Sequence, residues 1–209
     1  LGRELRGADL ALADNNPLDL AYVSLDSSGE TRTDKESFTL KQLPPETKAR
    51  IKQTGIRFLK RLNLPPGRHQ VRVGVYDTAN GATGTVMYDL DVPAFSKLPF
   101  SMSGLLVTSR EALSTMTARG DPELQKFLKL PPAALRTFPQ NDEVGVVTET
   151  YDRSGTTPHT VDINTTVKSR EGKVVFEHND QRSSDELKGD NGAYVHGIGL
   201  AVGELPPGG

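Results

Sequence analysis

The chain has 209 residues, a formal net charge of −2, 35% hydrophobic residues and no cysteine. Its length fits one large domain or two domains of about 100 residues with modest cores, and the missing cysteine excludes disulfides, thiolate metal sites and a thiol nucleophile. The near-neutral charge gives no bulk attraction for nucleic acid, and no apolar run approaches the roughly 18 residues that span a bilayer.

The two ends of the chain indicate an excised internal piece of a longer protein. The first six residues are charged and polar and lack the apolar stretch of a signal peptide, and residue 1 is Leu rather than Met. The last residues, 205–209, form an unfinished turn sequence. We therefore expect any export signal to lie on the parent protein.

The first quarter of the chain predicts short strands and one short helix. Residues 18–25 alternate apolar and polar side chains and run into the turn residues Asp26-Ser27-Ser28-Gly29, which is typical of a strand that ends in a turn. Residues 37–40 predict a short strand. Residues 47–53 are good helix formers between Pro45 and Gly55. Residues 56–62 predict another strand.

The strongest local pattern begins at Leu64-Pro65-Pro66-Gly67. Val71, Val73 and Val75 alternate with Arg72 and Gly74, which is the period of a half-buried strand. Turn residues follow at 77–81, and residues 85–92 return as a second strand that Pro93 ends. The segment predicts an antiparallel hairpin.

The second half predicts a linker, a short helix and further strands. The linker is 94–100, and the helix begins at Asp121-Pro122 and continues to about Lys129. The polar stretch 179–191 predicts a long mobile loop. The predicted strands are 105–108, 143–151, 161–167, 173–177 and 193–202.

Two sequence landmarks occur twice. Leu-Pro-Pro-Gly stands at 64–67 and 205–208, and an Asp-x-Ser-Gly strand ending stands at 26–29 and 152–155. They predict two modules with the same strand order, the second without its closing hairpin. Short strands with frequent turns favour an all-β fold of two tandem Ig-like or fibronectin-III-like antiparallel sandwiches, 1–95 and 97–209, each with a short helix.

The hairpin block also resembles a known family. Leu64-Pro65-Pro66-Gly67-Arg68-His69-Gln70-Val71-Arg72-Val73, Tyr76-Asp77, Gly81, Gly84 and Asp89-Leu90-Asp91-Val92-Pro93 resemble the region that follows the integrin-like domain in bacterial (acidobacterial-type) VWFA-related proteins. The resemblance covers residues 56–109. It implies an exported multi-domain protein, periplasmic, cell-surface or extracellular, with Ig-like or fibronectin-III-like modules.

The metal-dependent adhesion motif of that family is not present here. The motif has the form Asp-x-Ser-x-Ser, whereas Asp26-Ser27-Ser28-Gly29-Glu30 lacks the final Ser. The resemblance therefore does not bring metal-dependent adhesion to this chain.

Calcium and transition-metal sites are open alternatives to plain structural roles. Extracellular sandwiches bind calcium through carboxylates at strand ends. The candidate ligands are Asp77, Asp89, Asp91, Asp180, Asp185 and Asp190, although Asp77 also suits a turn and Asp89 and Asp91 an outward sheet face. His178, near Glu177 and Asp180, forms together with His196 a second hypothetical site, for a transition metal. His69 is interpreted as a packing or turn-bonding residue.

No nucleophile elbow, zinc-protease motif or paired catalytic carboxylates stand out in the sequence, and we expect no enzyme. The leading hypothesis is a non-enzymatic interaction or spacer module that binds a protein or glycan partner through loops or sheet edges. An unpaired edge in the second module would accept a neighbour's strand. The alternative is a calcium- or carbohydrate-binding module with a site at the cleft between the two domains.

Overall fold

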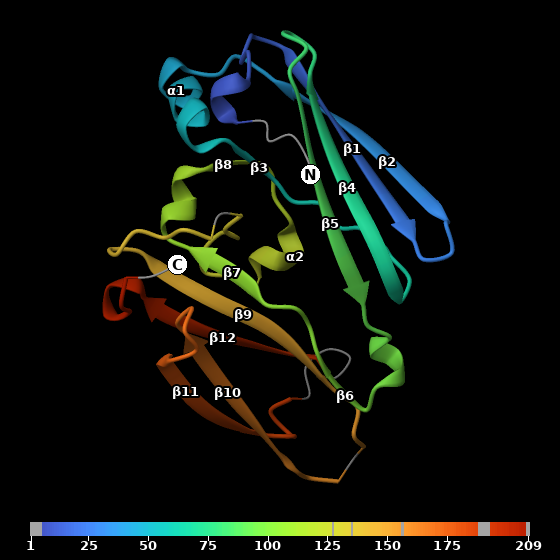
Figure 1. Cartoon of the computed structure of the whole chain (residues 1–209), viewed down its shortest axis with the longest axis vertical. Helices are drawn as coiled ribbons and strands as arrows, with labels where there is room; N and C mark the ends of the chain where they lie inside the picture. The colour runs from blue at the N-terminus through green and yellow to red at the C-terminus, as the bar shows by residue number, and fades with distance from the viewer. Residues whose placement is uncertain (1–5, 127, 135, 156, 188–192, 208–209) are drawn as a thin grey trace. The chain divides into compact units, whose positions relative to one another are not determined.

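The chain is predominantly antiparallel β-structure in a computed structural model (Figure 1). The structure describes residues 6–126, 128–134, 136–155, 157–187 and 193–207. It divides into two compact units: unit 1 is Leu1–Ala94 with Ser114–Asp121, and unit 2 is Phe95–Leu113 with Pro122–Gly209. The all-β class expected from the sequence is confirmed.

Unit 1 is built on a four-stranded antiparallel sheet. Its strands are β1 (Asn16–Asp26), β2 (Thr31–Leu40), β4 (Gly67–Asp77) and β5 (Thr83–Val92), in the order β2-β1-β4-β5. The predicted β4–β5 hairpin is confirmed, with Val73 opposite Val86. Gly67 has φ 133°, a region that residues with a Cβ rarely adopt, so the Leu-Pro-Pro-Gly sequence ends in a glycine that the chain needs there.

One face of this sheet carries the core of unit 1. The alternating Leu18, Leu20 and Tyr22 of β1 are buried, as the period of a half-buried strand requires. The helix α1 (Pro45–Thr54) places Ile51, which is completely buried, against this face. The central cluster consists of Leu10, Leu12, Leu18, Leu40 and Ile51.

A small parallel sheet completes unit 1 and comes from two distant parts of the chain. The strand β3 (Ile56–Phe58) pairs in parallel with β8 (Met116–Arg119). The single strand expected over 56–62 is therefore shorter, because it has only this four-residue partner. The sequence boundary assigned 97–209 to one domain, whereas the structure groups Ser114–Asp121 with unit 1.

Unit 2 contains a second sheet around β9 (Glu143–Asp152). The long strand β12 (Ala193–Ala201) pairs with one edge of β9, and the short strands β6 (Phe100–Met102) and β7 (Leu106–Ser109) share the other edge. The strands β10 (Thr160–Lys168) and β11 (Val174–Ser183) form a separate hairpin. The helix α2 (Pro122–Gln125) is shorter than the sequence predicted.

The remaining elements of the described residues, in both units, are the single 3-10 turns η1 (Gly7–Asp9), η2 (Phe95–Lys97), η3 (Glu111–Ser114) and η5 (Val202–Glu204).

The prediction of a long loop over 179–191 is wrong in its first part. The strand β11 continues to Ser183, and its polar end pairs with β10, Asp180 opposite Ile163 and Arg182 opposite Val161. An ion pair of 2.7 Å joins Asp180 and Arg182 within the strand. The polar composition of this segment suggested a solvated loop. In the strand, however, Asp180 and Arg182 neutralise each other's charge, so the segment can pair with β10. Residues 188–192 of the predicted loop lie outside the described residues.

The two repeated landmarks share local turn chemistry but not topology. In both Asp-x-Ser-Gly endings the Ser amide donates to the Asp Oδ1 at 2.9 Å, from Ser28 to Asp26 and from Ser154 to Asp152. However, β1 pairs with β4, which follows the first Leu-Pro-Pro-Gly, whereas β9 pairs with β12, which precedes the second copy. The expectation of one shared strand order is therefore wrong, and Gly208 of the second copy lies outside the described residues.

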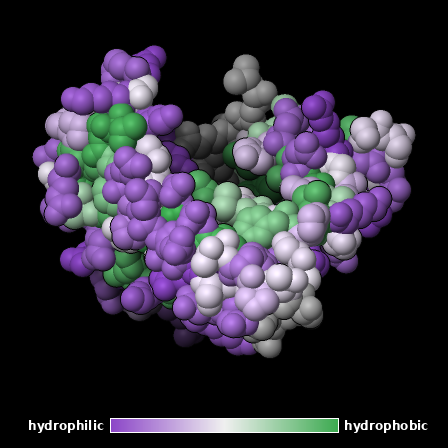
Figure 2. Space-filling model, turned by 90° about the horizontal axis from the view of Figure 1, so that it is seen from below, coloured by the Kyte–Doolittle hydropathy of each residue, from purple (hydrophilic) through white to green (hydrophobic). Residues whose placement is uncertain are grey.

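The surface of the described residues carries separate apolar groups among polar ones, as Figure 2 shows for the face that it presents. The large apolar side chains exposed in unit 1 are Leu25, Tyr76, Val86, Met87 and Tyr88. Within the described part of the chain, the helices are too short and too polar to cross a membrane.

Candidate functional site

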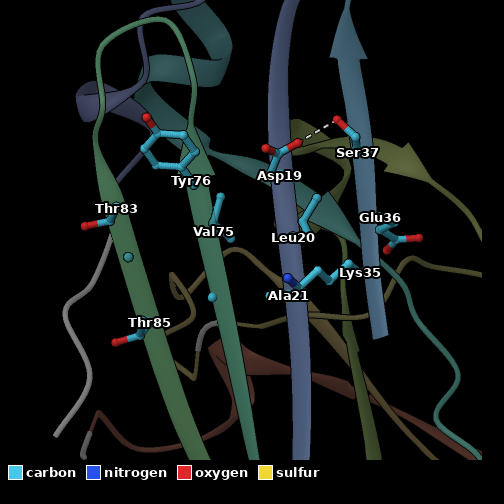
Figure 3. A pocket seen from close by; sticks show the side chains of 12 residues that line it. Asp19, Leu20, Ala21, Lys35, Glu36, Ser37, Val75, Tyr76, Thr83 and Thr85 are labelled. Carbon is cyan, nitrogen blue, oxygen red and sulfur yellow. Dashed lines mark hydrogen bonds between the residues drawn. The ribbon is translucent and has the colours of Figure 1, made fainter. Parts of the chain in front are cut away.

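A groove of about 620 Å³ crosses all four strands of the unit 1 sheet (Figure 3). It is lined by three consecutive residues from each strand, which are 19–21 of β1, 35–37 of β2, 74–76 of β4 and 83–85 of β5. The register places Ala21 opposite both Lys35 and Gly74, and Tyr76 opposite both Asp19 and Thr83. These side chains lie on the face of the sheet opposite Leu18, Leu20 and Tyr22, because alternate residues point to opposite faces.

The groove exists because two adjacent central positions carry almost no side chain. Ala21 and Gly74 are cross-strand neighbours in the middle of the sheet. A Cβ placed on Gly74 would meet only the Thr85 Cγ2, at 3.9 Å, which is an ordinary contact. Gly74 is not among the glycines with positive φ, so the backbone does not demand glycine here. The backbone conformation does not require a glycine at this position. The missing side chain of Gly74 instead leaves the space of the groove above it.

Polar side chains of both charges stand around this hollow. The Ser37 Oγ donates a hydrogen bond of 2.7 Å to Asp19 Oδ1. Lys35 reaches from β2 toward Ala21, and the Tyr76 ring stands over β4 (Figure 3). Tyr76 is 44% exposed, so its ring is accessible from solvent. The groove thus offers an acceptor, a cation, hydroxyl groups and one aromatic ring around an apolar floor.

A charged network on the other face of the sheet holds β1 and β2 in place below the groove. The Tyr22 hydroxyl donates to Glu36 Oε1 at 2.7 Å, and Lys60 Nζ lies 2.7 Å from Asp34 Oδ2. Arg119 of β8 also forms an ion pair with Glu36. Burial and the hydrogen bond to Glu36 raise the pKa of Tyr22, so its hydroxyl stays protonated and remains a donor.

Asp77, one of the calcium candidates, has a structural role in the β4–β5 turn. It is fully buried, and its carboxylate accepts hydrogen bonds from the Ala11 amide at 2.8 Å, Asn16 Nδ2 at 2.9 Å and the Ala79 amide at 3.0 Å. These donors occupy both carboxylate oxygens. The side chain therefore connects the N-terminal segment, β1 and the hairpin turn.

The other carboxylates proposed for calcium are spread over both units. Asp89 accepts a hydrogen bond from Gln70 at 3.3 Å, and Asp91 lies opposite Arg68 on the sheet. Asp180 is paired with Arg182, Asp185 lies in the turn after β11, and Asp190 lies outside the described residues. Within the described ranges, no group of three or more His, Asp and Glu side chains has a metal-binding arrangement. A calcium site remains a prediction.

His178, Asp180 and Arg182 of β11 act electrostatically on His196 of β12, but within the described residues they do not form a metal-binding group. His196 of β12 is 7% exposed, and its Nε2 has no hydrogen-bond partner among the described residues. Burial lowers the pKa of His196; Asp180 acts in the opposite direction, whereas Arg182 and His178 lower the pKa further. His196 is the buried member of this group, whereas His178 is exposed and Asp180 and Arg182 are half-buried, and its surroundings disfavour a second positive charge beside Arg182.

His69 has the turn-bonding role expected from the sequence. Its ring is buried, and Nε2 lies 2.8 Å from the carbonyl oxygen of Pro65. Because a carbonyl only accepts, Nε2 carries the proton in this bond. The side chain thereby fastens the Leu-Pro-Pro-Gly segment to the beginning of β4.

No protein-family model, curated protein or solved structure matches this chain. The resemblance to VWFA-related proteins therefore remains a prediction.

Sequence reasoning missed the groove, although one signal for it was present. Gly74 lies between Val73 and Val75, at a position of β4 that points away from the core, and a glycine inside a strand often marks a close approach of a ligand or another backbone. The neighbouring Ala21 belongs to a strand 53 positions earlier, and only the register Ala21–Gly74 makes the two small residues one hollow.

Proposed function

We propose that this chain is a non-enzymatic interaction module of an exported bacterial multi-domain protein, and that it binds a short glycan in the groove of unit 1. The observation that carries the proposal is the groove of about 620 Å³ over Ala21 and Gly74. Its volume lies within the range of about 300–1,000 Å³ typical of small-molecule sites.

The chemistry of the lining favours a sugar over an apolar ligand. A sugar ring presents hydroxyl groups at its rim and C–H groups on its faces. Asp19 and Ser37 form a hydrogen-bonded pair that can exchange bonds with such hydroxyls, and Lys35 supplies a donor. The exposed ring of Tyr76 offers a flat apolar surface with a polar tip.

The wider setting of the module rests on the sequence. The resemblance over residues 56–109 supports export in a bacterial multi-domain protein and Ig-like or fibronectin-III-like sandwiches in tandem. The antiparallel sheets of both units are compatible with that architecture. In this setting the chain acts as a spacer between other domains. Its β-sheet also presents a surface that binds a partner.

A glycan microarray with the purified chain tests the proposal, followed by calorimetric titration with the soluble oligosaccharide that gives the strongest signal. Gly74→Val fills the hollow, and we expect it to abolish binding while the chain stays folded. Tyr76→Ala should weaken binding about tenfold, which corresponds to about 1.4 kcal/mol. Tyr88→Ala is the matched control, because Tyr88 is exposed on the opposite face of the same hairpin.

Two outcomes would contradict the proposal. One is the absence of binding to any oligosaccharide on the array. The other is glycan binding that Gly74→Val leaves unchanged, since the ligand would then sit elsewhere on the chain. Loss of binding in both tyrosine variants would indicate a general effect on the hairpin and would also count against the groove.

A further inference from the structure

We propose that the glycan of the unit 1 groove is acidic, a chain of hexuronic acid residues, and that Lys35 and Arg72 bind one of its carboxylates beside Ala21. This inference rests on the proposed function, because it names the class of sugar that the same groove takes. The observation that carries it is the order of charges on this face of the sheet, which changes from negative to positive across the hollow.

The strand register divides the groove face of the sheet into rows that run across the strands. The row of the hollow holds Lys35, Ala21 and Gly74. The row on one side holds Asp19 and the row on the other side holds Arg72, because these residues lie two positions from Ala21 and Gly74 along their own strands. An acid therefore lies before the hollow, one cation lies beside it and a second cation lies beyond it.

Lys35 is the cation at the hollow itself. It lines the groove, and its exposed side chain extends from β2 toward Ala21 of β1 (Figure 3). Within the described part of the chain, the Lys35 ammonium group has no acidic partner, whereas Lys48 and Lys60 of the same unit are paired with carboxylates at 3.0 and 2.7 Å. The ammonium group of Lys35 is therefore available to an anionic ligand.

Arg72 is the second cation, and a neighbouring side chain holds its guanidinium in place. Gln70 Oε1 accepts hydrogen bonds from Arg72 Nε at 3.0 Å and from Arg72 Nη2 at 2.6 Å. The acid of the next row, Asp89, accepts a hydrogen bond from Gln70 and not from Arg72. Arg72 Nη1 has no hydrogen-bond partner among the described residues. A planar guanidinium group fixed in this way suits a carboxylate.

The two cations can act on one bound anion. They stand on the two sides of β1, Lys35 on β2 and Arg72 on β4, in adjacent rows. Two strand spacings and two residue steps place their Cα atoms about 12 Å apart, a distance that two long side chains and one carboxylate between them can span. The β1 residues between them, Ala21 and Val23, are half-buried and uncharged. A carboxylate above them would meet two cations and no acid.

Asp19 gives the ligand its direction in the groove. Its carboxylate accepts a hydrogen bond from Ser37 and lies in the row next to Lys35. A carboxylate repels an acid but accepts hydrogen bonds from sugar hydroxyl groups. A hexuronic acid ring fits both ends, because its carboxylate and its C2 and C3 hydroxyl groups lie on opposite sides of the ring. We therefore expect its hydroxyl groups at Asp19 and its carboxylate at Lys35.

Calorimetric titration of the whole chain with matched pairs of oligosaccharides tests this inference. The acidic probes are trisaccharides of galacturonic, glucuronic or mannuronic acid, and each one is compared with the same trisaccharide whose carboxylates are reduced to primary alcohols. We expect the wild type to bind one acidic probe at least about tenfold more tightly than its reduced counterpart. This preference should shrink in high salt, because salt screens exposed charges.

Variants assign the preference to the two cations. Lys35→Gln should weaken binding of the acidic probe about tenfold and change binding of the reduced probe less than about twofold. Lys35→Arg keeps the charge and should keep the preference, and Arg72→Gln should weaken it by less than Lys35→Gln. Lys52→Gln is the matched control, because Lys52 is an exposed residue of α1, and α1 packs on the other face of the sheet. It should bind both probes like the wild type.

The inference fails alone, with the proposed function intact, if the reduced probes bind as tightly as the acidic ones and Gly74→Val abolishes that binding. It also fails if Lys35→Gln leaves the preference for the acidic probe unchanged, or if Lys52→Gln removes the preference as fully as Lys35→Gln. If no probe binds and the glycan array also gives no signal, the proposed function fails with it. Thermal melts of every variant establish that each one is folded before its affinities are compared.

Discussion

Among the described residues, unit 1 has eight buried apolar and five buried polar residues, whereas unit 2 has three buried apolar and eight buried polar residues. The apolar set of unit 2 is Val144, Leu187 and Leu200. Burial of apolar surface stabilises without regard to direction, whereas a buried polar group stabilises only when its partners are correctly placed. Unit 1 should therefore depend on packing, and unit 2 on hydrogen bonds and on pH.

The buried carboxylate of Asp142 in unit 2 is stabilised by hydrogen bonds. The Ser109 Oγ donates to Asp142 Oδ2 at 2.6 Å, and the amides of Glu111 and Glu143 donate to Asp142 Oδ1 at 3.1 and 2.8 Å. Burial alone would raise the pKa of Asp142, but these bonds lower it, so the carboxylate stays charged. His196 lacks such a set of bonds, because its buried Nε2 has no hydrogen-bond partner among the described residues.

The largest expected effect is on the core of unit 1. Ile51→Ala should cost about 3 kcal/mol of unfolding free energy, because Ile51 is completely buried and its loss leaves a cavity. Hydrogen exchange measured by mass spectrometry should show faster exchange in β1, β4 and α1. Leu113→Ala, at an exposed position, should change stability by less than about 0.5 kcal/mol. Equal acceleration in β9 and β12 would mean that the two interiors unfold together and would remove the contrast.

Asp77→Asn should have the next largest effect, about 2 kcal/mol, since one amide oxygen cannot accept the three bonds that the carboxylate holds. Urea unfolding measures the loss. Asp89→Asn is the control, because Asp89 is exposed and has one long hydrogen bond of 3.3 Å. A loss below about 0.5 kcal/mol in Asp77→Asn would show that this polar group is dispensable and that unit 1 rests on apolar packing alone.

The third prediction concerns pH and unit 2. The pKa of His196 is lowered in the folded state, so the unfolded chain binds its proton first as the pH falls. Its contribution to stability is complete above the ordinary pKa of about 6.5 and is lost as the pH falls through the lower folded pKa. His196→Leu should therefore flatten the decline in unit 2 stability between about pH 7 and pH 5.

The stability contribution of His159 changes with pH in the opposite direction to that of His196. The effect of His196 must therefore be measured as a difference between the variant and the wild type. Its hydrogen bond to the Thr157 carbonyl, together with Asp152, raises the pKa of His159, so its contribution is complete below about pH 6.5 and is lost as the pH rises. This contribution cancels in the difference between the opening free energies of the β12 amides, obtained from their exchange rates, in the wild type and in His196→Leu. If the two proteins show the same pH dependence, the polar interior of unit 2 is not pH-sensitive at His196.

The smallest effect on stability is expected for Arg119, in the second segment of unit 1, Ser114–Asp121. Arg119→Ala should cost about 0.5 kcal/mol, because the Arg119–Glu36 ion pair is largely exposed on the arginine side. Urea titration in low and high salt measures it, and the difference from the wild type should shrink in high salt. A loss above about 2 kcal/mol would show that this ion pair is a main attachment of β8 rather than a minor one.

Local structure in this chain could be predicted from short sequence patterns. The alternation of Val71, Val73 and Val75 together with the turn at 77–81 predicted the β4–β5 hairpin, and Pro45 and Gly55 bounded α1. Side-chain alternation and turn chemistry act over a few residues, so the sequence shows them directly. The role of His69 followed for the same reason, since Pro65 lies four residues away.

Long-range pairing decided what the sequence could not. The partner of β3 lies 60 positions along the chain, in β8, and the charged end of β11 is a strand because Asp180 and Arg182 pair beside β10. The groove has the same origin, because Ala21 and Gly74 become one hollow only through the register of β1 and β4. The sequence by itself determined the all-β class and its turns, which depend on neighbouring residues. Tertiary structure decided which strands pair, which polar groups are buried and where a ligand can lie, because those depend on residues that meet only after folding.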